Sequence, residues 1–111
     1  MIDLHLDIDI RTLTDEDAKK KIDNINKVAE HFYSIKNYED SKYCTDNALE
    51  LAEAISYVKG IADAKYNLGK LNFVSEDYFS CIQSLIEAEK LFESCNDLKN
   101  CAKVCFQLGL A

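Results

Sequence analysis

The sequence has no proline and only three glycines in 111 residues. Turns depend on glycine, proline, asparagine and aspartate, so a β-rich chain of this length would need more of the first two. Their scarcity favours helices joined by short loops. No apolar run approaches the roughly 18 residues that indicate a membrane span. The length allows one domain and not two.

Positive charge is also scarce, with 13 basic residues against 20 acidic ones and a net charge of −7. Nucleic-acid binding needs clustered lysine and arginine to neutralise phosphates, so this class of function is disfavoured. The only basic run, Lys19–Lys21, lies among acidic residues, and an anionic membrane surface is disfavoured for the same reason. The start, Met1–Leu4, is acidic where a signal peptide carries positive charge. We therefore expect a cytoplasmic protein whose five cysteines are free thiols.

Apolar residues make up 48% of the chain, which is enough to bury a core. The first ten residues alternate apolar and polar side chains, and this period of two is typical of a strand. The apolar positions are Ile2, Leu4, Leu6, Ile8 and Ile10. We predict that residues 1–13 form an extended leader, which pairs with a second copy, docks on a helix or stays loose. Residues 14–111 are predicted to form the helical domain.

From Thr14 onward the apolar residues recur at spacings of three and four, which is the period of a helix. Thr14 precedes three acidic residues and predicts a helix N-cap. Later helix starts are predicted at Asn37, at residues 58–61, at Asp77 and at Asn96. The result is five helices, and their short loops force neighbouring helices to run antiparallel.

The sequence of the helical part is similar to itself when one copy is shifted by 40 residues. Matching positions include Tyr38 with Tyr78, Ala48 with Ala88, and Leu68–Gly69 with Leu108–Gly109. These small and aromatic residues fall at fixed helix positions, where paired helices touch. Glycine inside a helix costs about 1 kcal/mol relative to alanine, so the two repeated glycines indicate close helix packing.

Residues 62–69 resemble the first helix of a tetratricopeptide repeat, and residues 76–88 resemble its turn and second helix. The Leu68–Gly69 pair matches the Leu-Gly pair of that family. Ala88 matches the family's second alanine, and Cys81 stands where a small alanine is usual. The resemblance covers the chain from about residue 22 to its end.

The resemblance implies an all-α fold, a right-handed α-α superhelix of two helix hairpins plus a partial third. Lys65 and Asn72 depart from the usual tryptophan and tyrosine, and the closing proline is absent. The 40-residue period also exceeds the family's usual one of roughly 34 residues. The alternative fold is a plain helical bundle.

In this family the first helix of each repeat lines a concave groove, which implies a non-catalytic module that binds a protein or peptide. Carried over, the groove positions are Asp23, Asn26, Glu30, Tyr33, Asp63, Tyr66, Lys70, Phe73, Lys103 and Phe106. The aromatic members could instead pack between helices. Some family members clamp a terminal carboxylate with lysine and asparagine, which Asn67 and Lys103 resemble, but Glu30 would repel such a group.

A second hypothesis follows from the long repeats, which are familiar in regulatory regions of bacterial signalling proteins. The chain would then be the sensory part of a diguanylate cyclase, a histidine kinase or a peptide-responsive transcription factor. A full-length gene that continues into a catalytic or DNA-binding domain would favour this hypothesis.

Catalytic and metal sites are poorly supported, so no enzyme activity and no cofactor are expected. His5 and His31 lie in no metal-ligand or triad spacing. Cys101 and Cys105 share a helix face, but no CxxC pair fixes a zinc site. We interpret the cysteines as packing residues, and we expect Cys81 to be buried between helices.

The last predicted helix lacks a partner. We expect Val104, Leu108 and Leu110 to be partly uncovered and the chain to be a fragment of a longer protein, the alternative being a natural five-helix protein. Uncovered apolar area favours self-association. We therefore predict a homodimer through Val104 and Leu108, or through the leader at residues 2–10.

Overall fold

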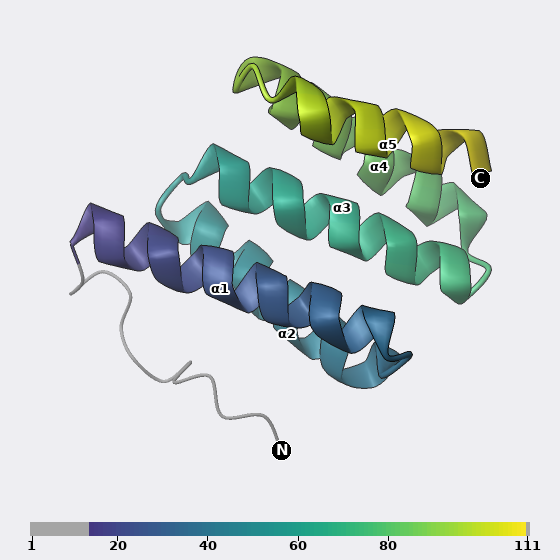
Figure 1. The fold of residues 1–111 in the computed structure, drawn as a ribbon, viewed down its shortest axis with the longest axis horizontal. Helices are drawn as coiled ribbons and strands as arrows, with labels where there is room; N and C mark the ends of the chain where they lie inside the picture. Colours follow the sequence, from purple (N-terminus) through teal and green to yellow (C-terminus); the bar gives the residue numbers. More distant parts are fainter. Residues whose placement is uncertain (1–13, 111) are drawn as a thin grey trace.

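The computed structural model describes residues 14–110, and the predicted leader lies outside them. These residues form five helices joined by tight turns, and they contain no strand (Figure 1). The helices are α1 (Asp15–Ser34), α2 (Tyr38–Ala54), α3 (Val58–Val74), α4 (Tyr78–Ser94) and α5 (Leu98–Leu110). The all-α prediction is confirmed.

The helices form two layers (Figure 1). In Figure 1, α1, α3 and α5 lie in front and run in the same direction, while α2 and α4 return behind them. Helix α3 packs against α1, α2 and α4, and α5 packs against α4. Side chains of α1, α3 and α5 can therefore lie together on the exposed face of the front layer.

Polar side chains start three of the helices where the sequence predicts. Thr14 Oγ1 accepts a hydrogen bond from the Asp17 N–H at 3.2 Å. Asn37 and Asp77 accept in the same way at the starts of α2 and α4. The prediction for Asn96 is wrong by one residue, because Asp97 caps α5 by accepting from the Asn100 N–H at 3.2 Å.

The four turns share one backbone geometry. Each contains one residue with positive φ, and these residues are 20 positions apart: Lys36 (63°), Ser56 (55°), Glu76 (64°) and Asn96 (56°). The N–H of the following residue donates to the carbonyl five positions back, at 2.8–2.9 Å. This is the Schellman arrangement that ends many helices. Asn96 therefore occupies the left-handed position, which asparagine tolerates, and does not cap α5.

Because none of these left-handed residues is glycine, the turns can be stabilised. We expect Glu76→Gly to raise the free energy of unfolding by about 1 kcal/mol, since glycine removes the strain of a Cβ in the left-handed region. Urea unfolding measures the change. The neighbouring Ser75 has φ of −83°, so Ser75→Gly should give no gain. Equal gains at both positions would contradict the strain argument.

Three clusters of buried apolar side chains hold the layers together, and the smallest joins α1 to α2 through Ala18, Ile22 and Ala52. The largest cluster joins α3, α4 and α5 through Ala62, Cys81, Leu85, Ala88, Phe92 and Val104. The other side of α3 contributes Ala64 to a cluster with α1 and α2. Cys81 is fully buried, as predicted. Most of these side chains are small, so the helices approach closely.

The expectation that Val104 is uncovered is wrong. Val104 is completely buried, and Leu108 packs half-buried against the same cluster. Both lie on the side of α5 that faces α4, whereas the outward side carries Leu98 and Phe106, which are 75% and 70% exposed. The apolar area that remains on α5 is therefore on its opposite face.

Candidate functional site

A hollow of about 300 Å³ opens between the three front helices. Helix α1 contributes Asp23, Asn26, Lys27 and Glu30, helix α3 contributes Lys59 and Asp63, and helix α5 contributes Lys99, Asn100 and Lys103. We call this the α1/α3/α5 hollow. It brings together five of the residues predicted for the groove: Asp23, Asn26, Glu30, Asp63 and Lys103.

The sequence reasoning missed Lys27, Lys59, Lys99 and Asn100 as lining residues. Three of the four lie one helical turn from a predicted groove residue, because residues four apart share a helix face. Lys59 precedes Asp63 by four residues, for example, and Lys99 precedes Lys103 by four. Extending each predicted position by one turn would have found these lysines.

The acidic groups at the α1–α3 side of the hollow already have partners. Lys59 Nζ lies 3.0 Å from an Asp63 carboxylate oxygen and 4.0 Å from Asp23 Oδ1. The Tyr57 hydroxyl donates to Asp23 at 3.0 Å. Burial raises the pKa of the Asp63 carboxyl above its ordinary value, although the hydrogen bond from Lys59 opposes this shift. Asp23 and Asp63 therefore already have partners on this side of the hollow, where two carboxylates share one ammonium group.

The lysines on the other walls are different. Within residues 14–110, the side chains of Lys27, Lys99 and Lys103 form no ion pair. Glu30 also lines the hollow without an ion-pair partner, so these four side chains carry a net positive charge. The chain as a whole has a charge of −7, so this is a local reversal of sign.

Two buried asparagines connect α1 and α3 beneath the hollow. Asn26 Nδ2 donates to the Gly60 carbonyl at 3.2 Å, and Asn67 Nδ2 donates to the Asn26 carbonyl at 3.4 Å. Both side chains are only 3% exposed, and the Oδ1 atom of each has no hydrogen-bond donor. Asn26 also lines the hollow, so a buried acceptor without a partner lies at its wall.

The predicted aromatic groove residues lie outside the hollow. Lys70 Nζ lies 4.7 Å from the Tyr33 ring centre and 4.8 Å from the Tyr66 ring centre, so the ammonium joins α1 to α3. Burial lowers the pKa of Lys70. Phe73 contacts Tyr78 edge-to-face at 5.6 Å. These side chains pack between helices and do not line the hollow, and Phe106 lies on the outward side of α5.

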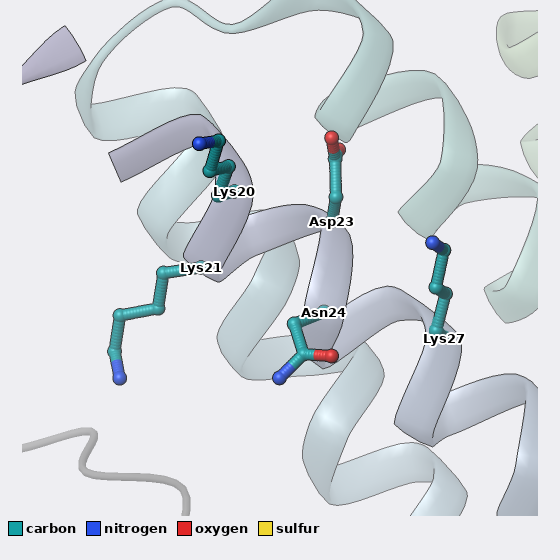
Figure 2. Close-up of a pocket in the computed structure, with 5 residues that line it drawn as sticks. All are labelled: Lys20, Lys21, Asp23, Asn24 and Lys27. Atoms are coloured by element: carbon teal, nitrogen blue, oxygen red, sulfur yellow. The ribbon is translucent and has the colours of Figure 1, made fainter. Parts of the chain in front are cut away.

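A second depression lies on α1 alone (Figure 2). It is lined by Lys20, Lys21, Asp23, Asn24 and Lys27. Figure 2 shows that Lys21 and Asn24 point away from the other three side chains. Because the five side chains come from one helix and do not converge, this surface offers no enclosed site.

The five cysteine thiols differ in burial and in their hydrogen-bond partners. No group of three potential metal ligands occurs among residues 14–110. Burial raises the pKa of the Cys44 thiol to about 11 and also raises the pKa of Cys81. Cys105 donates to Glu89 Oε2 at 3.4 Å, which favours the thiol form. None of the five cysteines forms a disulfide.

Comparison of the chain with protein-family models, with curated proteins and with solved structures found no match. None of the helices within residues 14–110 has an apolar stretch long enough to cross a membrane. The function is therefore inferred from the residues of the hollow itself.

Proposed function

We propose that the chain is a non-catalytic module that binds an acidic peptide segment in the α1/α3/α5 hollow. The observation that carries this proposal is the set of unpaired lysines, Lys27, Lys99 and Lys103, around a hollow in a strongly acidic protein. Carboxylates of a peptide pair with these ammonium groups.

The position of Glu30 orients the ligand. Glu30 on α1 has no ion-pair partner in the hollow, so it repels a carboxylate placed near it. The anionic group therefore binds at the α5 wall, beside Lys99 and Lys103. Exposed ion pairs contribute only about 0–1 kcal/mol each, so we expect weak binding that weakens further as the salt concentration rises.

The arrangement of the helices supports a repeat architecture of the tetratricopeptide type, as a right-handed superhelix. The turns recur every 20 residues with the same left-handed residue, so two successive helices and turns make the 40-residue period. Each helix pair buries its apolar face against the next pair, which is how solenoids are stabilised. In such folds the first helices of the hairpins face the ligand, and here α1, α3 and α5 line the hollow.

A peptide selection tests the function. Peptides selected from a random library for binding to the native chain should be enriched in aspartate and glutamate. For a labelled peptide from that selection, Lys99→Glu with Lys103→Glu should weaken binding by roughly 10–100-fold in fluorescence anisotropy. The matched control is Lys90→Glu on α4, which lies outside the hollow and should leave the affinity unchanged. Undiminished binding by the double variant would refute the proposal.

A further inference from the structure

The outward side of α5 carries an apolar strip that no part of residues 14–110 covers. Its members are Leu98, Ala102, Cys105, Phe106 and Gly109, and all of them are exposed. We call this the outward strip. Leu98 and Phe106 are 75% and 70% exposed, so the strip presents two large side chains to solvent.

The equivalent strip on α3 is covered by the neighbouring helix α4. Forty residues earlier, Ala62 is fully buried and Tyr66 packs against the same cluster of α4 residues. A Cβ added to Gly69 would lie 2.6 Å from Leu85 Cδ2, so a leucine of α4 fills the space above this glycine. A Cβ added to Gly109 would meet no atom within 4 Å. The strip on α5 therefore occupies the position of a helix-packing surface, and no helix within residues 14–110 covers it.

The spacing of the strip fits a parallel helix pair. Leu98, Ala102, Cys105 and Gly109 follow one another at intervals of four, three and four residues. This is the heptad spacing of a coiled-coil seam, in which the same positions of two helices face each other. Phe106 lies beside the seam and extends it.

Charges of opposite sign flank the strip. On one side lie Lys99 and Lys103, which line the hollow. On the other side lies α4, where Glu89 accepts a hydrogen bond from Cys105 and where Glu93 is exposed. A two-fold axis parallel to α5 exchanges these flanks, so the lysines of each copy meet the glutamates of its partner. An antiparallel pairing would instead place lysines against lysines.

We propose that the outward strip is the interface of a parallel homodimer, in which it packs against the same strip of a second copy. The second copy is the occupant that the strip specifies, because its apolar seam and its charged flanks are complementary to themselves under one two-fold axis. The interface engages Lys99 and Lys103, which also line the hollow, so dimer formation and binding of an acidic peptide compete for these two side chains.

Sedimentation of the native chain tests the interface. The chain should sediment as a dimer at micromolar concentration, and Phe106→Glu should weaken the dimer at least roughly tenfold. The matched control is Phe79→Glu, which changes an even more exposed phenylalanine on α4 and should leave the dimer intact. A native chain that stays monomeric overturns the proposal and leaves the strip to a different partner. Equal weakening by the control also overturns it.

Charge reversal tests the parallel arrangement. Lys103→Glu should weaken the dimer, and adding Glu89→Lys in the same chain should restore it, because the two flanks meet across the two-fold axis. Failure of the second substitution to restore the dimer would contradict the parallel arrangement.

Cross-linking gives an independent readout. In the proposed dimer the two Cys105 thiols face each other, and a copper–phenanthroline catalyst with oxygen should join them. The two thiols lose two protons and two electrons, and the electrons pass through copper to oxygen. A covalent dimer should form with Cys95→Ser and not with Cys105→Ser. The opposite dependence would refute the seam, since Cys95 is also exposed but lies outside it.

Discussion

Alanine in place of Phe92 should lower the free energy of unfolding by about 3–5 kcal/mol. Phe92 is 1% exposed and belongs to the cluster that joins α3, α4 and α5. Removing its ring leaves a cavity where Leu85 and Val104 also pack, and the small residues around it cannot expand to fill the space. Urea unfolding followed by far-ultraviolet circular dichroism measures the loss.

The same helix offers a matched control for this substitution. Phe79 is 80% exposed, so Phe79→Ala should change stability by no more than about 0.5 kcal/mol. Phe92→Leu keeps most of the buried volume and should cost less than about 1.5 kcal/mol, which keeps the effect measurable even if the alanine variant unfolds. Similar losses for Phe79→Ala and Phe92→Ala would show that the cluster does not hold the fold together.

The helices and most of their starts are predictable from the sequence because their causes are local. A side-chain acceptor before an acidic first turn is enough to fix the starts of α1 and α2 at Thr14 and Asn37. Asn96 and Asp97 are adjacent and both are good caps, so local chemistry alone does not choose between them. The repeat does choose, because Asn37, Tyr57, Asp77 and Asp97 occupy the same position after each left-handed residue.

The exposed face of α5 was not predictable from periodicity. The spacing of apolar residues shows only that a helix has an apolar face. Helix α5 has two such faces, one with Val104 and one with Phe106. Only the packing of α4 decides which of them is buried. The repeat again contains the signal, since Ala64, forty residues before Val104, is also completely buried.

The candidate site was also predictable from the sequence only in part. Its acidic members and Lys103 were predicted by carrying helix positions between repeats, because residues at equivalent positions face the same side, whereas the other lysines were missed. The aromatic residues Tyr33 and Tyr66 occupy equally plausible positions, yet they contact Lys70 and pack between helices. Their size determines this outcome, since a long side chain near the helix contact reaches the neighbouring helix. The spacing of residues in the sequence does not show how far a side chain extends toward the neighbouring helix.

Gly69→Ala should destabilise the fold by about 1–3 kcal/mol, although alanine is the better helix former. The added Cβ would lie 2.6 Å from Leu85 Cδ2 and 2.7 Å from Leu85 Cγ. Leu85 is completely buried and belongs to the same cluster as Phe92, so it cannot move without disturbing the core. Equilibrium unfolding in urea gives the magnitude.

Two further variants separate this steric cause from helix propensity. Gly109→Ala at the equivalent position of α5 has open space around its Cβ within one chain, so in the monomeric Phe106→Glu background it should stabilise the helix by up to about 1 kcal/mol. Leu85→Ala by itself should cost about 2–5 kcal/mol, because it leaves a cavity above Gly69. In that background Gly69→Ala should change sign and become stabilising, because the new methyl group occupies part of the cavity. The coupling between the two substitutions measures the α3–α4 contact directly. If Gly69→Ala changes stability equally in the native chain and in the Leu85→Ala variant, the close contact is refuted.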